Sequence, residues 1–323
     1  MAKTTLDSLW KEFQEYIEPG NTDRSNRTYF PTGIPDLDRS FGSFRGMQSG
    51  IVEILGGEAV GKSTLALQTL ATTQKTQQLK EVQTPDGHRY NAVYMDFEHT
   101  YDAKYAKTIG VDTEKLLILS MTYAQQQFQI VEFLLAEGIQ FVIIDSIAVI
   151  IPMSEEEKEV TDNEKMADEA KVIGRALKRL NALAAAHDAL ILVINQYRAN
   201  ISALAMVEKK GYGAWILRYL KKATIELTRV KRADTRMYIE AFVVKNKMGA
   251  IGQKVAYVIE HGKGIQNDQH IFSLAIDYDI ITRNGAWYMY DTLRAQGETN
   301  ALALFPMDHI RTQVLAAMEK ETL

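Results

Sequence analysis

The chain contains the stretch Gly56-Gly57-Glu58-Ala59-Val60-Gly61-Lys62-Ser63-Thr64, which lies between an apolar run at 51–55 and a helix-like run. The spacing G-x-x-x-x-G-K-S is typical of a phosphate-binding loop, with a chance match in a strand–turn–helix connection as the alternative. The glycines allow a tight turn whose backbone N–H groups, with the positive end of the helix, attract phosphate oxygens. Lys62 would reach the outer phosphates and the Ser63 hydroxyl would hold Mg²⁺. The stretch predicts a nucleoside-triphosphate site, but it does not indicate which process the hydrolysis of the triphosphate would drive.

Composition narrows the class of protein. The 323 residues are 46% hydrophobic and 24% charged, which is ordinary for a globular chain of one large domain or two unequal ones. There is no cysteine, so disulfides and cysteine metal sites are excluded. Without an apolar stretch of about 18 residues or a signal core, we expect a cytoplasmic protein with no membrane span. The formal net charge is −4, so any DNA binding would depend on a local basic patch.

Apolar runs alternate with helical patterns through the first two thirds of the chain. The predicted strands are 50–55, 92–97, 115–119, 141–145 and 190–195, and the predicted helices are 63–78, 103–109, 124–136 and 168–187. This alternation predicts an α/β fold, a mostly parallel twisted sheet with helices on both faces. Three further apolar runs, 223–229, 237–244 and 254–259, follow without helices between them. They predict an antiparallel extension of the sheet.

The two ends of the chain differ from this core. Residues 6–17 have apolar side chains at helical spacing, and a polar segment follows them. A short amphipathic helix cannot bury its face alone, so we expect it to dock on the core or on another subunit. From residue 267 onward, short helices and an aromatic strand predict a small α+β module. The predicted division is therefore an N-terminal helix and linker at 1–29, a core at 30–266 and a C-terminal domain at 267–323.

Polar residues that follow predicted strands could complete a hydrolytic site. Asp145 ends an apolar strand, where a carboxylate holds the water shell of Mg²⁺; a loop cap is the alternative. Glu98 follows another strand end and is the predicted general base; a solvated carboxylate is the alternative. His99 beside it is expected to pack or hydrogen-bond locally. Gln196 follows a third strand and opens into a loop, so its amide could sense a γ-phosphate, unless it is an ordinary strand-end polar residue.

Taken together, these motifs resemble the RecA-type recombinases of bacteria and phages. The resemblance covers roughly residues 30 to 323, with a RecA-type ATPase core. It is carried in order by 55–65, 96–99, 101–106, 109–112, 145–148, 194–198, 244–247 and 285–288. It implies an ATP- and Mg²⁺-dependent enzyme that forms helical filaments on single-stranded DNA and exchanges strands with double-stranded DNA. Such a protein would act in the cytoplasm of a bacterium or of a phage-infected host.

The resemblance also implies roles for residues around the nucleotide. Asp102 and Tyr105 would contact adenine, and Glu98 would position the attacking water. Gln196 would couple the γ-phosphate to DNA. Lys245 and Lys247 would reach the ATP of the neighbouring subunit and act in hydrolysis there. Positive charge supplied across an interface stabilises the transition state only in the assembly, which would make filament formation a switch.

Two segments, 153–178 and 198–215, are the predicted DNA-binding regions. The residues at family contact positions, or adding charge beside them, are Met166, Lys171, Lys178, Arg198, Ile201, Lys209, Lys210, Gly213 and Ala214, followed by Arg218, Lys221 and Lys222. A solvated charged turn is the alternative. The segment 154–159 is more acidic than a DNA surface should be, and 199–207 lacks the aromatic residue and several glycines common in the family. A short chain without a long acidic tail leans toward a phage protein.

Other classes remain open. A ring helicase or hexameric motor shares such a core but usually carries a separate loading domain, for which this chain offers only a short N-terminal helix. A recombination mediator would bind ATP without exchanging strands, and the intact Glu98, Gln196, Lys245 and Lys247 argue against it. A small-molecule kinase would have no use for the basic run after Gln196.

Overall fold

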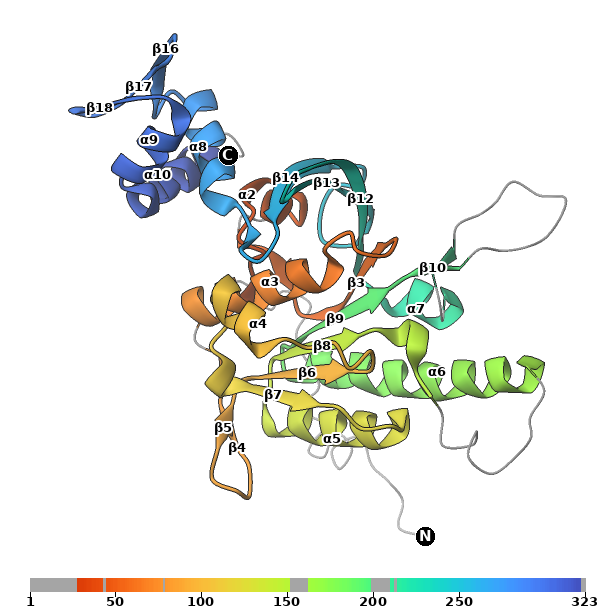
Figure 1. The fold of residues 1–323 in the computed structure, drawn as a ribbon. Helices are drawn as coiled ribbons and strands as arrows, with labels where there is room; N and C mark the ends of the chain where they lie inside the picture. Colours follow the sequence, from red (N-terminus) through yellow and green to blue (C-terminus); the bar gives the residue numbers. More distant parts are fainter. Residues whose placement is uncertain are drawn as a thin grey trace, which may run out of the picture.

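The computed structural model describes residues 28–42, 45–77, 79–151, 162–198, 210–211 and 214–320. In these residues the main element is a nine-stranded sheet (Figure 1). Its strands, in spatial order, are β15 (Gly264–Ile265), β14 (Lys254–Glu260), β13 (Arg236–Asn246), β12 (Ala223–Ala233), β3 (Gly50–Gly56), β9 (Leu190–Asn195), β8 (Phe141–Asp145), β6 (Ala92–Asp96) and β7 (Leu116–Leu119). The strand that feeds the phosphate loop, β3, therefore lies inside the sheet.

Strand direction divides the sheet into two parts. The strands from β12 to β7 pair in parallel. From β12 to β15 each pair is antiparallel. Consequently β12 belongs to both parts, since it is parallel to β3 and antiparallel to β13. The predicted α/β fold with an antiparallel extension is confirmed.

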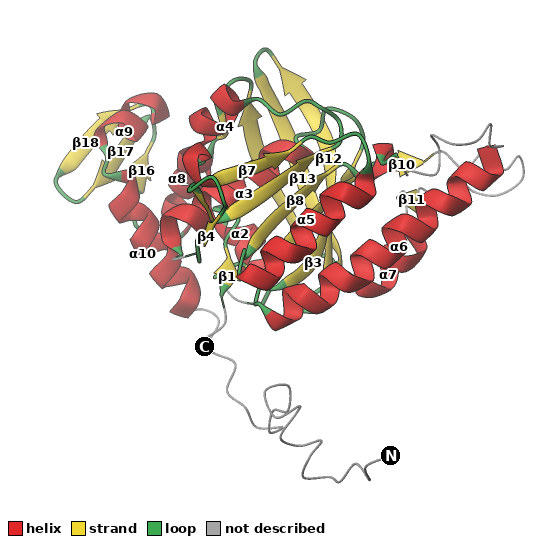
Figure 2. Cartoon of the chain, turned by 90° about the horizontal axis from the view of Figure 1, so that it is seen from below, coloured by secondary structure: helices red, strands yellow, loops and turns green. Residues whose placement is uncertain are grey.

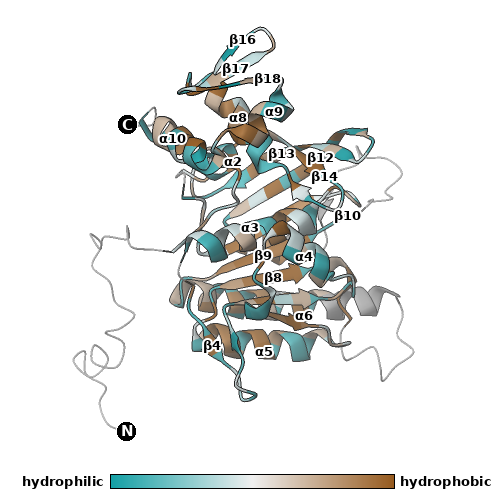
Figure 3. Cartoon of the chain, turned by 60° about the vertical axis from the view of Figure 1, so that its left-hand side comes forward, coloured by the Kyte–Doolittle hydropathy of each residue, from teal (hydrophilic) through white to brown (hydrophobic). Residues whose placement is uncertain are grey.

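Helices cover both faces of the sheet (Figure 2). On one face α3 (Lys62–Thr76) and α4 (Ala103–Ile109) share a buried cluster with Val52 and Ile54. On the other face α5 (Ala124–Glu137), α6 (Asp162–Ala186) and α7 (Ala214–Leu220) pack with Ile51 and Val93. Successive strand residues point to opposite faces, so a strand covered on both sides is apolar throughout. Figure 3 shows this as apolar strands between amphipathic helices.

Boundaries differ from the sequence predictions in a few places. A 3₁₀ turn at Thr113–Lys115 precedes β7, so that strand begins one residue later than expected. Helix α6 begins before the predicted residue 168. The sequence pattern missed the short pairs β1 (Tyr29–Phe30) with β2 (Met47–Gln48) and β4 (Val82–Gln83) with β5 (Arg89–Tyr90), and the helix α2 (Pro35–Ser40). Strands of two residues have no period to detect.

The C-terminal residues form their own cluster beyond β14 (Figure 1). The elements are α8 (Asn267–Asp277), β16 (Thr282–Asn284), β17 (Trp287–Tyr290), β18 (Leu293–Gln296), α9 (Glu298–Leu304) and α10 (Met307–Lys320). Buried Phe272, Tyr288 and Ile310 lie at its centre. The predicted helix at 6–17 lies outside the described residues. Over the described ranges, none of the helices has the length and apolar character that a bilayer crossing requires.

Candidate nucleoside-triphosphate site

The phosphate loop connects β3 to α3, and two of its glycines are required by close contacts. Gly61 has φ 86°, in the left-handed region, and a Cβ there would lie 2.2 Å from the Ile259 Cδ1 atom of β14. A Cβ on Gly56 would lie 2.7 Å from the carbonyl oxygen of Leu227 on β12. A side chain at Gly61 would collide with the antiparallel part of the sheet, and one at Gly56 with the strand that pairs with β3 in parallel. The loop is thus shaped by the sheet extension as well as by its own sequence.

Lys62 is the first residue of α3, and its side chain folds back over the loop. Its Nζ atom donates to the carbonyl oxygens of Gly57 at 2.5 Å and Gly56 at 3.3 Å. Burial lowers the pKa of this amine, while nearby carboxylates, led by Asp145, oppose the shift. The first N–H groups of an α-helix have no partner within the helix, and the first residues of α3 line the same cavity. Amine, helix end and loop together suit a phosphate chain.

Asp145 lies beside the loop and is held by two hydroxyl groups. Its Oδ2 atom accepts hydrogen bonds from Ser63 Oγ at 2.6 Å and from Tyr94 OH at 2.5 Å. Burial raises the pKa of Asp145, and the two hydroxyl donors oppose that shift. The contact with Tyr94 was missed by the sequence analysis, because Tyr94 looks like one more apolar residue of a buried strand.

The Ser63 hydroxyl and the Asp145 carboxylate suit Mg²⁺, which needs few protein ligands, better than a metal ion whose ligands all come from protein side chains. In the described part of the chain, no group of three or more His, Cys, Asp or Glu side chains could hold a metal ion. Mg²⁺ usually takes one or two protein oxygens and completes its shell with water and substrate phosphates. The adjacent Ser63 hydroxyl and Asp145 carboxylate supply that kind of donor set.

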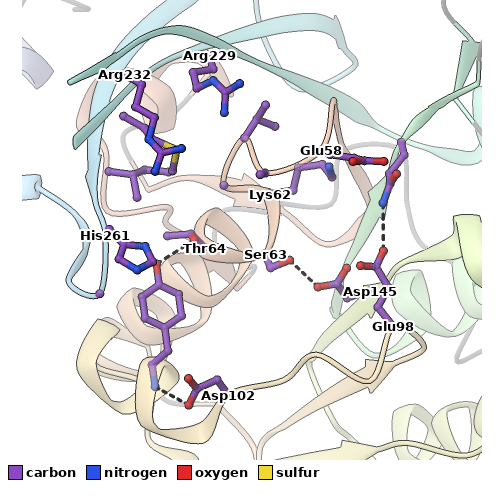
Figure 4. Close-up of a pocket in the computed structure, with 18 residues that line it drawn as sticks. Glu58, Lys62, Ser63, Thr64, Glu98, Asp102, Asp145, Arg229, Arg232 and His261 are labelled. Atoms are coloured by element: carbon purple, nitrogen blue, oxygen red, sulfur yellow. Dashed lines mark hydrogen bonds between the residues drawn. The ribbon is translucent and has the colours of Figure 1, made fainter. Parts of the chain in front are cut away.

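Glu98 and Gln196 are brought into direct contact. Gln196 Nε2 donates to Glu98 Oε1 at 3.2 Å (Figure 4). Ser146 Oγ donates to the same oxygen at 2.6 Å. Glu98 follows β6 and Gln196 follows β9, with β8 between them in the sheet. His99 is exposed and its Nδ1 atom contacts Ser120 Oγ at 2.7 Å, a local interaction of the predicted kind.

The other end of the site is formed around α4. Tyr105 OH lies 3.0 Å from Thr64 Oγ1. The Asp102 carboxylate caps α4 by accepting from the backbone N–H groups of Lys104 and Tyr105. His261, from the turn after β14, lines the same cavity as Tyr105 (Figure 4). This end therefore offers an aromatic ring and an imidazole beside a carboxylate.

Most of these residues line one cavity of about 860 Å³. The predicted residues that line it are 58–64, Glu98, Asp102, Tyr105, Asp145 and Gln196. The lining residues that the sequence analysis did not identify are Arg229, Arg232, Met237, Ile259, His261 and Gly262. These all come from the antiparallel extension, where no motif marks them, so only the folded sheet brings them to the loop.

The family model described as "RecA N-terminal domain" matches residues 3–266 of this chain. The chain belongs to the RecA family. Protein RecA of Sulfurimonas denitrificans is 30% identical over 287 residues, covering 86% of this chain and 79% of that protein. Protein RecA of Mycoplasma mycoides subsp. mycoides is 27% identical over 311 residues, covering 94% and 86%. For Protein RecA of Fusobacterium nucleatum the identity is 29% over 309 residues, with 94% and 78% covered. The resemblance of the motifs to RecA-type recombinases is confirmed.

In this RecA-family chain, Lys245 and Lys247 do not line the cavity. They lie at the end of β13, where Lys245 Nζ donates to the Arg218 carbonyl at 2.5 Å and Lys247 Nζ to the Tyr219 carbonyl at 3.1 Å. Both carbonyls belong to the last turn of α7. Burial, with the positive charges of Lys247 and Lys221, lowers the pKa of Lys245 to about 8.

Only part of the predicted DNA surface is described. Arg198 on β10 (Tyr197–Arg198) pairs with Lys210 on β11 (Lys210–Gly211), which brings the two ends of the segment between them together. Lys171 and Lys178 are exposed on α6. Of the other predicted contacts, Met166 lies within α6 and Ala214 begins α7, whereas Ile201, Lys209 and Gly213 lie outside the described residues.

Lys221 does not belong to the basic surface that the sequence predicted. Its amino group pairs with the buried carboxylate of Glu53 on β3. The other carboxylate oxygen of Glu53 accepts from Asn195 Nδ2 at 2.8 Å, and Asn195 Oδ1 accepts from the Gln196 backbone N–H at 2.9 Å. Lys221 looks like a free surface charge in the sequence, but in the fold it neutralises Glu53, because a buried carboxylate requires a partner.

Proposed function

We propose that this RecA-family chain is a DNA-stimulated ATPase that assembles on single-stranded DNA as a helical filament. It pairs that strand with double-stranded DNA and exchanges strands. The observation that carries the proposal is the contact between Glu98 and Gln196 beside the phosphate loop. A base that touches a residue leading directly into β10 suits an enzyme whose hydrolysis responds to DNA.

The phosphate end of the cavity would hold the triphosphate of ATP. Lys62 and the start of α3 would bind phosphate oxygens, and Ser63 would contribute its hydroxyl to Mg²⁺. Asp145 would act through water, since its carboxylate already accepts from Ser63 and Tyr94. Bound Mg²⁺ would neutralise charge that develops on the phosphates during hydrolysis.

The base of the nucleotide would lie at the α4 end. Tyr105 and His261 provide flat, partly apolar faces, and Asp102 provides a carboxylate at the start of α4. Adenine fits a site with an aromatic face and a polar edge. His261 thereby joins the two adenine contacts that the sequence analysis proposed.

Glu98 would orient the attacking water and accept its proton. Its Oε1 atom is fixed by Ser146 and Gln196, so its carboxylate is oriented before the reaction. Gln196 would register the γ-phosphate and pass its position to β10 and the segment that follows. The residues of that segment, together with Lys171 and Lys178 on α6, would bind DNA phosphates.

Lys245 and Lys247 would act on the ATP of a neighbouring subunit. Their position away from their own cavity supports this assignment. Cations delivered from a second chain would stabilise the transition state only in the filament. Hydrolysis by an isolated chain would accordingly be slow.

The proposed domains follow the buried clusters. One cluster extends from Phe30 to Ile265, and another from Ile271 to Met318. These clusters support a core at 30–266 and a C-terminal domain at 267–323. Residues 1–29, as a helix and linker, would bind the next subunit. The chain would work in the cytoplasm of a bacterium or of a phage-infected cell.

Two measurements test this function. ATP turnover should increase at least about tenfold on adding single-stranded DNA, as expected if assembly completes the site. Electron micrographs with DNA and a non-hydrolysable ATP analogue should show helical filaments, and Lys62→Ala should form none. Unchanged turnover with DNA would argue against the proposal, and closed rings would support a hexameric motor instead.

A further inference from the structure

The hairpin of β12 and β13 contains an irregularity beside the cavity. Arg229 pairs with Ile239 and Lys231 pairs with Tyr238, so Val230 is an extra residue on β12. Such a β-bulge shifts the alternation of side chains by one position. Arg229 and Arg232 thus lie on the same face of the strand, where a regular strand would place them on opposite faces.

The shared face is the one that closes over the phosphate loop. Arg232 pairs with Met237, which in turn pairs with Ile259, the residue that contacts the Gly61 position. Both arginines line the same cavity as Lys62 and lie on the side away from Asp102 (Figure 4). Lys231, on the opposite face, has its Nζ atom 5.8 Å from the centre of the Tyr238 ring.

The two arginines and the carboxylates on the opposite side of the cavity differ in whether they have hydrogen-bond partners among the described residues. Asp145, Glu98 and Asp102 each accept hydrogen bonds from their own surroundings. Arg229 and Arg232 are exposed, and among the described residues no hydrogen bond or ion pair engages either guanidinium. Two such cations on a concave surface attract an anion. A guanidinium group can donate two parallel hydrogen bonds to the oxygens of one phosphate.

We propose that Arg229 and Arg232 form a second anion subsite of the cavity, which binds phosphate groups of the nucleotide from the hairpin side. This inference rests on the proposed function, because the ligand is the same ATP. The β-bulge at Val230 is the device that creates the subsite, since it turns a second arginine into the cavity. Bulges beside functional sites commonly redirect side chains in this way.

The test compares nucleotide binding by the whole chain without DNA. Calorimetry would measure ATP, tripolyphosphate and adenosine with wild type and with the double variant Arg229→Gln/Arg232→Gln. We expect the dissociation constants of ATP and tripolyphosphate to rise about tenfold in the double variant and about threefold in each single variant. Losses of this size are typical of charge-assisted hydrogen bonds. Adenosine binding should not change. Lys231→Gln is the matched control, because it removes a neighbouring charge from the other face.

Several results would overturn the subsite. ATP affinity within twofold of wild type, an equal loss in Lys231→Gln, or an equal loss of adenosine binding would each do so. Unchanged ATP affinity with weaker binding of DNA would assign the arginines to a DNA backbone instead. Failure of wild type itself to bind ATP would count against the proposed function. If the double variant unfolds, as measured by its melting temperature, the single variants give the answer.

Discussion

Lys62 and Lys245 make the same contact in two different regions of the molecule. Each amino group donates to backbone carbonyls, and burial lowers the pKa of both amines. The carbonyls beneath Lys62 belong to the phosphate loop, inside the cavity. The carbonyl beneath Lys245 belongs to the end of α7, outside it.

Under the proposed function, this difference indicates which half of the site one chain supplies by itself. Around Lys62 the loop, Ser63 and Asp145 are already in contact. Lys245 has a lowered pKa and lies near other cations, an arrangement that would become favourable when an anion arrives. The comparison therefore separates Lys62, which we propose binds the nucleotide of its own chain, from Lys245, which we propose acts on the nucleotide of the next subunit.

Of the substitutions that test this difference between the two lysines, Lys62→Ala should have the largest effect on ATP turnover. We expect Lys62→Ala to lower ATP turnover by at least about 10³-fold, because phosphate binding and charge stabilisation are both lost. The same variant should fail to bind tripolyphosphate in calorimetry. Turnover close to wild type would remove the loop lysine from the reaction, provided that the melting temperature of the free protein is unchanged.

Glu98→Gln tests the chemical step separately from binding. It keeps the shape of the side chain but cannot take a proton, so turnover should fall about 10²- to 10³-fold. ATP binding and filaments with DNA should persist. Loss of ATP binding along with turnover would show that Glu98 has a structural role through Ser146 and Gln196.

Lys245→Ala tests whether the second lysine acts on another chain. We expect DNA-stimulated turnover to fall about tenfold or more, while ATP binding by the free chain stays within twofold. Mixing Lys245→Ala with Glu98→Gln should restore part of the turnover, because some interfaces then combine an intact Glu98 with an intact Lys245. No recovery in the mixture would contradict action between subunits.

The pKa of about 8 for Lys245 predicts a dependence on pH. In the free chain the amine holds its proton below pH 8 and loses it as the pH rises, so DNA-stimulated turnover at subsaturating ATP should fall above about pH 8. Lys245→Arg should remove this fall, because guanidinium keeps its proton. The free energy of unfolding should rise between pH 8 and 10.5, where only the unfolded chain still binds the proton. A profile identical in Lys245→Arg would assign the titration to another group.

Tyr94→Phe should have the smallest effect. It removes one hydroxyl from Asp145 and leaves Ser63 in place, at a cost of about 1 kcal/mol of unfolding free energy. We expect the Mg²⁺ concentration for half-maximal turnover to change by about threefold, with turnover at saturating Mg²⁺ near wild type. An unchanged Mg²⁺ requirement would leave Tyr94 with a packing role only.

Much of the cavity could be predicted because its markers are local. The phosphate loop is a contiguous motif, and Glu98, Asp145 and Gln196 each directly follow an apolar strand. The carboxyl ends of parallel strands meet at one edge of a sheet, so the prediction that they share a site follows from the fold class. Their contacts and the cavity they line agree with that prediction.

The order of strands and the register of β12 were not available from the sequence. Arg232 shares a face with Arg229 only because of the bulge at Val230. Lys221 looks like a surface charge until β3 places Glu53 against it. These features depend on residues distant in the chain, whose pairing has no local signal.

The sequence by itself determined the α/β class, the phosphate loop and the family, because these depend on periodicity and on contiguous motifs. The tertiary structure alone decided which charges face the cavity and which are held elsewhere. The physical reason is that a side chain's role follows from its nearest neighbours in space. For Arg232, Lys221 and Lys245, those neighbours come from other strands and helices of the fold.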